Sequence, residues 1–348
     1  MNKFNASNLF RRKLMRRIAR NIGDSKIKPN TKPLNREDVK RVLISRPNHR
    51  LGNLLLITPL VQEVSNTFPN SQIDLFVKGN LGSIVFKNYE KIDKIIILPK
   101  KHFKQLHKYL GGWLSVKRRK YDLVINVVYN SSSGRLSTKF ADATYKFYGG
   151  EDNSNNLGYP DYGHIAKSPV YNFRNYLSQL NFQFNQENVP PVDIKLSTSE
   201  LTEGKIILEN LIQKGKKTIC LFTYATGDKC YSPEWWLEFY ETLKTEFPDC
   251  NIVEVLPFEN VSQISFKEPT FYSQNIREIG AFIANTDIFI GADSGIMHLA
   301  NSAGTPVLGL FSVTPPETYG PYGAESIGIN TNQKNTAQIV EEMKKILD

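Results

Sequence analysis

Aspartate, serine and histidine side chains follow an apolar run in IFIGADSGIMHLANSAGTPVLGLF, residues 288–311. The run predicts a strand that passes directly into a helix beginning near Gly295. Free N–H groups and the dipole at a helix start attract an anion, and a glycine there lets a ligand approach the backbone. Asp293, Ser294 and His298 add polar groups at the same point. The stretch indicates a phosphate-type anion site; alternatively, Asp293 or Ser294 only caps the helix.

A second polar loop follows an apolar strand in FTYATGDKCYSPEWW, residues 222–236. Thr226 and Lys229 lie just beyond the strand, and Pro233 is a favoured first-turn residue of the next helix. A lysine at this position can pair with a diphosphate, although the loop is also typical of an ordinary strand-to-helix connection. The chain contains neither G-x-x-x-x-G-K-[ST] nor G-x-G-x-x-G. That absence argues against a nucleotide kinase and a dehydrogenase.

A third such loop, RPNHRLGNLLLITPL at residues 46–60, contains no carboxylate. Its residues of chemical interest are Arg46, His49, Arg50, Gly52 and Asn53. The two arginines can bind an anionic acceptor or donor phosphates. The imidazole of His49 titrates near neutral pH, or it only hydrogen-bonds to backbone.

Short apolar strands alternate with helices along most of the chain, which predicts βαβ units and parallel sheets. Strands are expected at 41–45, 72–77, 95–98, 123–128, 218–223, 251–256, 288–291 and 306–311, and helices at 52–64, 80–89, 101–118, 170–181, 199–213, 233–246, 275–285, 295–303 and 335–347. The polar stretch 149–163 is expected to be a loop bearing on a cleft. We therefore expect an α/β fold of two Rossmann-like doubly wound domains facing a central cleft, with ligands at the carboxyl ends of the strands.

The expected division of the chain has four parts: a basic arm and linker at 1–38, an N-terminal domain at 39–188, a C-terminal domain at 189–330 and a C-terminal helix at 331–348. Three scattered cysteines favour reduced thiols over a disulfide framework or a zinc site. No apolar run reaches the roughly 18–20 residues of a membrane span, and no signal peptide is recognisable.

The net charge of +10 is concentrated at the N-terminus. Residues 1–32 contain ten Lys or Arg residues and one acid, which leaves a balance of +1 for the rest. Apolar residues recur every fourth position at Phe10, Leu14, Ile18 and Ile22. This pattern predicts that residues 9–22 form a basic amphipathic helix on an anionic membrane surface. A solvated arm, or a helix docked on the protein itself, is the alternative. Nucleic acid is not expected as a partner, because no stacking aromatics alternate with the charges.

The three loops together resemble glycosyltransferase family 9, the heptosyltransferases of lipopolysaccharide core assembly. The motifs that carry the resemblance are LGNLLLITPL, TGDKCYSPEWW, GADSGIMHLANSAGTPVLGLF and TPPETYGPYG, within residues 41–330. The family implies a two-domain GT-B fold and a metal-independent, inverting transfer from a nucleotide-diphosphate sugar to a lipid-linked or lipopolysaccharide-type saccharide. The donor is implied to bind the C-terminal domain and the acceptor the N-terminal domain. No metal or resident cofactor is expected, and the implied location is the cytoplasmic face of the plasma membrane.

Carried over by position, Ser294 and Gly295 match the diphosphate contacts of the family, and Asp293 matches an acid near the donor sugar. His298 matches the histidine of the same helix, and Lys229 with Thr226 matches a loop at the donor phosphates. A helix start and a lysine can stabilise a leaving diphosphate without a metal.

Asn53 departs from the family pattern, which has an aspartate after the glycine of the opening motif as the general base. A neutral amide cannot accept that proton, so Asn53 is expected at most to orient the acceptor. His49 is the nearest titratable substitute, and further candidates are Asp152, Asp161 and His164. Two alternatives follow: a non-catalytic nucleotide-sugar or glycan-binding relative, and, as a poorer fit, a GT-B epimerase of nucleotide sugars.

Overall fold

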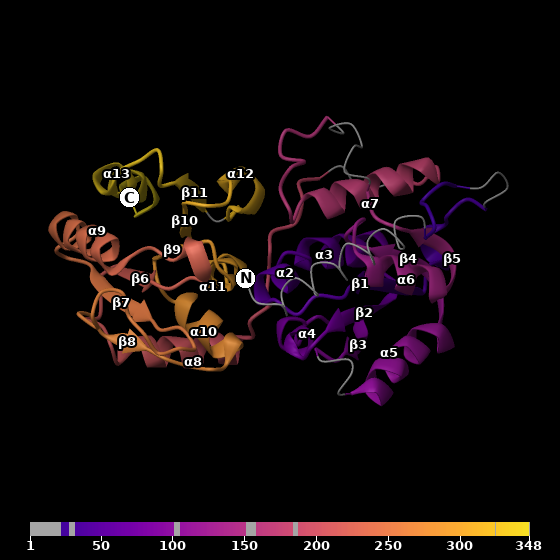
Figure 1. Ribbon diagram of the computed structural model, residues 1–348, viewed down its shortest axis with the longest axis horizontal. Coiled ribbons are helices and arrows are strands. Elements are labelled where there is room, and N and C mark those ends of the chain that lie inside the picture. Colours follow the sequence, from indigo (N-terminus) through magenta and orange to yellow (C-terminus); the bar gives the residue numbers. More distant parts are fainter. Residues whose placement is uncertain are drawn as a thin grey trace, which may run out of the picture.

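The computed structural model describes residues 22–27, 32–100, 105–150, 158–183, 187–323 and 325–347. They form two α/β units side by side, each built on one parallel sheet (Figure 1). The proposed membrane helix falls almost wholly outside this part of the chain, since only Ile22 of residues 9–22 is described.

The N-terminal unit contains a sheet of order β3-β2-β1-β4-β5. The strands are β1 (Arg41–Arg46), β2 (Gln72–Lys78), β3 (Ile92–Leu98), β4 (Lys120–Asn126) and β5 (Asp142–Phe147), after the short 3-10 helix η1 (Arg36–Asp38). The helices are α2 (Leu51–Leu55), α3 (Thr58–Thr67), α4 (Leu81–Val85), α5 (Leu106–Arg118), α6 (Ser132–Phe140) and α7 (Ser168–Gln179). Successive strand side chains alternate between two cores: Val42 and Ile44 face α3 and α7, whereas Leu43 faces α5. Helices therefore cover both faces of the sheet.

The C-terminal unit contains a sheet of order β11-β10-β9-β6-β7-β8. The strands are β6 (Thr218–Phe222), β7 (Asn251–Val255), β8 (Thr270–Phe271), β9 (Ile288–Ala292), β10 (Val307–Phe311) and β11 (Ile327–Asn330). The helices are α8 (Thr198–Glu209), α9 (Pro233–Glu246), α10 (Ile276–Ile283), α11 (Gly295–Ser302), α12 (Pro316–Tyr319) and α13 (Thr336–Leu347), with η3 (Gly227–Lys229) as a 3-10 turn. The last helix, α13, packs through Ile339, Val340 and Met343 into the core that contains Trp236 of α9.

Both sheets have the strand order of a doubly wound fold. The order of connection reverses between β1 and β4 in the first unit and between β6 and β9 in the second. A ligand crevice is expected at the carboxyl ends of these strand pairs. The loops after β1, β6 and β9 are the three loops whose polar residues drew attention in the sequence. The predicted pair of doubly wound units is confirmed.

Several elements differ from the sequence-based prediction. The helix expected over 52–64 is broken into α2 and α3, because Pro59 has no N–H to donate to the carbonyl of Leu55. The hydroxyl of Thr58 donates to that carbonyl instead, at 2.7 Å. The elements α6, β5, β8 and β11 were not predicted. The inward-facing side chains of α6 are small or polar, which hides its helical period.

Arg277 of α10 ties the two units together. Its guanidinium donates to the carbonyl of Ile84 in α4 at 3.2 Å and to that of Ile194 in the connecting segment at 3.0 Å. It also forms a bidentate pair with Glu200, at 2.6 and 2.7 Å. These hydrogen bonds hold the pKa of Glu200 well below its usual range. The pair lies within the C-terminal unit and orients the guanidinium of Arg277 toward the carbonyl of Ile84 in the N-terminal unit.

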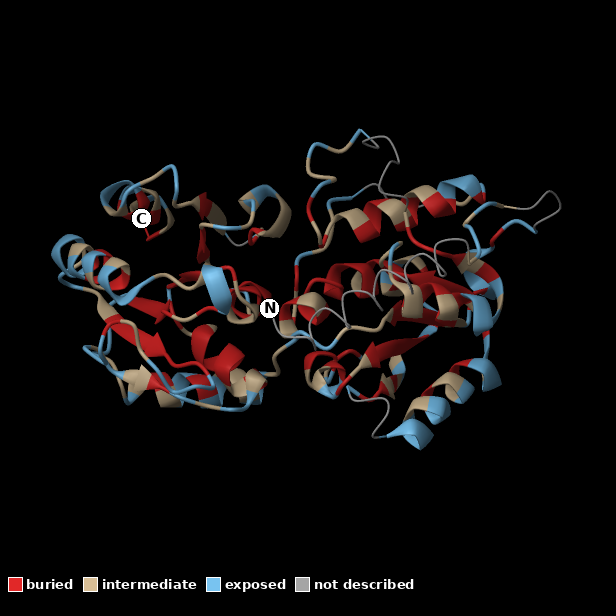
Figure 2. Ribbon diagram, in the orientation of Figure 1, coloured by how far each residue is buried: buried red, intermediate tan, exposed pale blue. Residues whose placement is uncertain are grey.

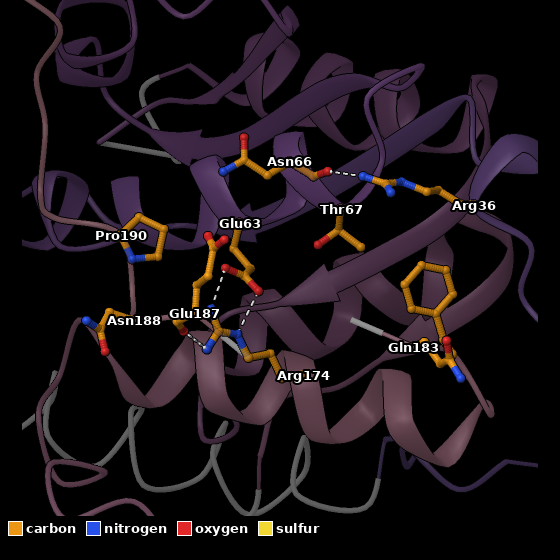
Figure 3. Close-up of a pocket in the computed structure, with 10 residues that line it drawn as sticks. Arg36, Glu63, Asn66, Thr67, Arg174, Gln183, Glu187, Asn188 and Pro190 are labelled. Atoms are coloured by element: carbon orange, nitrogen blue, oxygen red, sulfur yellow. Dashed lines mark hydrogen bonds and ion pairs between the residues drawn. The ribbon is translucent and has the colours of Figure 1, made fainter. Parts of the chain in front are cut away.

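A second buried ion pair joins α3 to α7 beside a cavity of about 190 Å³ (Figure 3). Arg174 donates to both carboxylate oxygens of Glu63, at 2.7 and 2.9 Å, and to the carbonyl of Glu187 at 2.7 Å. Both charged side chains are almost fully buried. Because Arg174 and Glu63 neutralise each other, their charges are not available to a ligand in the cavity. We therefore assign this cavity a structural role.

Replacing Arg174 by Met is expected to lower the free energy of unfolding by about 3–5 kcal/mol, since Glu63 would be left buried without its cation. Urea unfolding followed by circular dichroism measures the change. The matched control is Arg36→Met at the rim of the same cavity: Arg36 is exposed and donates to the carbonyl of Asn66. Its removal should cost under about 1 kcal/mol. Equal effects of the two substitutions would contradict this interpretation of the ion pair.

Candidate functional site

A cavity of about 580 Å³ lies where the two units meet. Its walls come from the loop after β1 with α2, the loops after β6 and β9, and the region around α12. The lining residues are Arg50, Leu51, Gly52, Asn53, Leu56, Ile165, Thr226, Lys229, Asp293, Ser294, Gly295, His298 and Tyr319. Nine of the eleven residues singled out from the sequence are among them. Three loops far apart in the sequence thus converge on one site.

Asp293 is the centre of the polar network on the C-terminal side. Its carboxylate accepts a hydrogen bond from the ammonium group of Lys229 and another, of 2.5 Å, from the hydroxyl of Thr314. The side chain of Asp293 is buried, whereas that of Lys229 is one-third exposed to the cavity. The ammonium group also lies 6.0 Å from the ring centre of Tyr319. Lys229 is therefore held at the cavity wall with its charge accessible to an anion.

Ser294 caps helix α11. Its hydroxyl oxygen accepts a hydrogen bond from the backbone N–H of Met297 at 3.2 Å. The capping alternative considered for this serine is thus realised in the structure. The helix start still faces the cavity, because Ser294 and Gly295 both line it. Capping and ligand binding are compatible here, since the positive end of the helix dipole remains directed at the cavity.

His298 lies in the same helix, one turn after Gly295. Its Nε2 atom is 3.9 Å from a carboxylate oxygen of Asp293. Burial lowers the pKa of His298 to about 4, although the negative charge of Asp293 acts in the opposite direction. The imidazole is therefore neutral at pH 7. It is a buried group that can accept a proton at the wall of the cavity.

The two units come into close contact at Gly52 and Gly295. A Cβ atom at Gly52 would lie 2.8 Å from Cδ2 of His298, and one at Gly295 would lie 3.3 Å from Cβ of Leu51. A side chain at Gly52 would collide with the imidazole and one at Gly295 would be crowded, so the approach of α2 to α11 favours glycine at both positions. This contact sets the imidazole of His298 directly beside the residue that precedes Asn53.

Arg46 lies behind Asn53 rather than in the cavity wall. Its guanidinium donates to the amide oxygen of Asn53 at 2.7 Å. Burial lowers the pKa of Arg46 to about 10, which still leaves the guanidinium charged at pH 7. Its buried Nε has no hydrogen-bond partner among the described residues. With its oxygen occupied, Asn53 can present its NH₂ group to a ligand.

His49 is not brought into the cavity, since its Cβ lies beside Gly79, at the end of β2. Asp161 accepts hydrogen bonds from Lys167 at 2.6 Å and from Tyr171 at 2.7 Å, outside the cavity lining. His164 is buried and donates from Nε2 to the carbonyl of Gly320 at 2.8 Å, joining the two units. Asp152 lies outside the described residues.

Sequence reasoning missed Thr314 and Tyr319, which contact Asp293 and Lys229. Both belong to TPPETYGPYG, a run that carried the resemblance but had been given no role. It also missed an adjoining cavity of about 290 Å³, which shares Thr226, Ser294 and Gly295 with the first. The further walls of this second cavity are mostly apolar or aromatic and include Phe222, Tyr224, Leu256, Phe258 and Ile276.

The sequence of this chain is similar to those of known glycosyltransferases. The model of glycosyltransferase family 9 (heptosyltransferase) matches residues 273–347, which hold Asp293, Ser294, Gly295 and His298. Lipopolysaccharide heptosyltransferase 1 of Campylobacter coli is 24% identical over 303 residues, covering 76% of this chain and 82% of that protein. This chain is similar to glycosyltransferase family 9. Both the expected family resemblance and the expected glycosyltransferase class are confirmed.

Solved structures of family 9 glycosyltransferases share the fold of this chain. The family 9 glycosyltransferase of Veillonella parvula superposes with a TM-score of 0.71 at 17% identity, covering 90% of this chain and 99% of that one. E. coli heptosyltransferase WaaC, solved with ADP, gives a TM-score of 0.64 at 15% identity, with 88% and 99% covered. The predicted GT-B architecture is thereby confirmed. Within the described part of the glycosyltransferase, no helix has the length and apolar character needed to cross a membrane.

Proposed function

We propose that this protein transfers a sugar from a nucleoside-diphosphate donor to a lipopolysaccharide-type saccharide, with inversion and without a metal ion. The observation that carries the proposal is the shared cavity, in which Lys229 and the start of α11 face Arg50 and Asn53 across the two units. One side offers positive charge for a diphosphate, and the other offers donors for a second substrate. A transferase needs both substrates in one cavity.

The donor half is formed by the C-terminal unit. Lys229, Ser294 and the N-terminus of α11 can neutralise the charge that develops on a leaving diphosphate. The adjoining cavity, with Tyr224 and Phe258 in its walls, is suited to an aromatic base and a ribose. ADP-heptose is the first donor to test, because the similar E. coli heptosyltransferase was solved with ADP.

The acceptor half is formed by the loop after β1. Arg50 lines the cavity, and the guanidinium of Arg46 adds positive charge just behind Asn53. Such a pair suits an acceptor that carries carboxylate or phosphate groups. We propose that the NH₂ group of Asn53 donates to the acceptor and orients it.

The proton of the acceptor hydroxyl is proposed to go to His298. Among the residues that line the described cavity, Asp293 and His298 are the groups able to accept a proton at neutral pH. Asp293 is already engaged by Lys229 and Thr314, whereas His298 is neutral and lies against Gly52. When donor phosphates attract Lys229, the carboxylate of Asp293 is released to stabilise the imidazolium ion that forms. His298 thus replaces His49 as the proposed base.

Residues 9–22 are proposed to hold the protein at the cytoplasmic face of the membrane, where a lipid-linked acceptor is available. The charge pattern of residues 1–32 supports this location.

Purified protein incubated with ADP-heptose and other nucleotide sugars, together with lipopolysaccharide-core acceptors, tests the proposal. Mass spectrometry should detect an acceptor that has gained one sugar, and EDTA should leave the rate unchanged. The absence of an aspartate at position 53 favours one competing function, a binding protein without catalysis. That function predicts saturable donor binding by calorimetry and no mass gain with any pair of substrates.

A further inference from the structure

Helix α5 has an outer face that no described element covers. Its inner face packs on the sheet through Gly112 and Val116. The ring of Trp113 makes an edge-to-face contact with that of Phe76, with 5.3 Å between the ring centres. On the outer side, Leu106, Leu110 and Leu114 are 55%, 54% and 47% exposed. Figure 2 shows the outer turns of α5 in pale blue at the lower right. Because these leucines recur every fourth residue, they form one stripe along the helix.

The stripe continues onto the neighbouring helix α6. Phe140, its last residue, is 53% exposed, and its ring centre lies 6.0 Å from that of Trp113. We call Leu106, Leu110, Leu114 and Phe140 the α5 patch. It holds four of the ten large apolar side chains that are exposed among the described residues. All the large apolar side chains that are exposed in the described part of the N-terminal unit therefore lie in this patch.

The chain segment that contains helix α5 carries charge of one sign. Between Asp93 and Asp122 the chain contains nine Lys or Arg residues and no acid. Three of these cations, Lys108, Lys117 and Arg118, are exposed on α5 itself. Some lysines elsewhere are ion-paired; Lys344 of α13, for example, contacts Glu246 at 2.7 Å. Since the chain beyond residue 32 is nearly neutral, this cluster is a local feature.

We propose that the α5 patch docks on an anionic lipid bilayer. A helix that lies in the membrane interface buries an apolar stripe among the acyl chains and places basic side chains at the headgroups. Each cation near the surface adds to the attraction. Self-association is disfavoured, because a two-fold contact through the patch would bring like charges together. This surface is separate from residues 9–22, and the inference does not depend on which sugar is transferred.

Vesicle flotation of the full-length protein tests the proposal. Vesicles of mixed phosphatidylglycerol and phosphatidylcholine should retain the wild type, and the combined variant L106Q/L110Q/L114Q should partition at least about tenfold more weakly. Glutamine keeps the helix propensity, and circular dichroism verifies folding. The matched control is Ile206→Gln on α8, whose side chain is 58% exposed on a helix that carries three glutamates and one lysine. Equal partitioning of the triple variant, the control and the wild type would overturn the proposal.

A second measurement separates docking of the α5 patch from any vesicle binding through residues 9–22. A polarity-sensitive fluorophore attached at Leu110→Cys, with Cys230→Ser and Cys250→Ser, should shift to the blue on adding anionic vesicles. The same label at Ile206→Cys should not shift. An unshifted label at position 110, or a dimer that dissociates on L106Q/L110Q/L114Q substitution while vesicle binding persists, would refute membrane docking. Neither measurement involves sugar transfer, so a failure of membrane docking can be distinguished from a failure of the proposed function.

Discussion

Lys229→Met is expected to lower kcat/KM about 10²–10³-fold, the usual cost of removing one preorganised donor from a developing charge. The structure holds the ammonium group against Asp293 at the cavity wall, where a diphosphate can displace the carboxylate. Removing Lys229 also leaves Asp293 with one hydroxyl partner, Thr314, so the like charges of the carboxylate and the donor phosphates would repel. Steady-state kinetics with the identified nucleotide sugar measures the loss.

Lys229→Arg should recover part of this activity, because the charge is retained while its position changes. The matched control is Lys87→Met, since Lys87 is also ion-paired, to Glu200 at 3.2 Å, but lies outside the cavity lining. Its kinetics should be unchanged. If Lys229→Met retained full activity, the donor phosphates would have to bind elsewhere.

His298→Gln is expected to lower kcat about 10²–10⁴-fold with little change in the KM for the acceptor, which is the range for loss of a general base. The pH profile of the wild type distinguishes a general base from a residue that only packs, because a purely structural role of His298 would not change that profile. Because burial lowers the pKa of His298 to about 4, the acidic limb of kcat/KM should lie well below the ordinary histidine range. Donor phosphates that draw Lys229 away raise that pKa, so the limb of kcat should lie at higher pH than the limb of kcat/KM.

His49→Gln provides the direct comparison between the two histidines. Since His49 lies beside Gly79 and outside the cavity lining, its substitution should leave kcat within about threefold of the wild type. Adding Asn53→Asp to His298→Gln should restore part of the rate, because a carboxylate then occupies the position of the base in the family pattern. A strong loss in His49→Gln together with normal kcat in His298→Gln would contradict the assignment of the base.

The architecture was largely predictable from local sequence. Buried parallel strands such as β6 and β9 are continuous apolar runs. Such a run can be recognised from its own residues, without knowledge of the residues that pack on it. The elements that escaped prediction lack such a signal. Helix α6 turns Gly134, Arg135, Ser137 and Thr138 inward, and Ser137 hydrogen-bonds to Ser45 of β1 at 2.6 Å. A polar helix face of this kind is stabilised by a partner that only the folded chain supplies.

Within the site, the sequence by itself determined which residues are proposed to bind the donor. Asp293 and Ser294 follow β9 directly, and Lys229 lies in the loop after β6, so a short-range pattern was enough to single them out. The tertiary structure alone decided which of the two histidines, His49 or His298, lines the cavity. His49 is four residues from Asn53 in the chain, but the backbone directs it toward Gly79; His298 is 245 positions away, but the Gly52–Gly295 contact sets it beside that loop. Proximity in the chain constrains a side chain only weakly, whereas close packing of two helices leaves the imidazole little freedom.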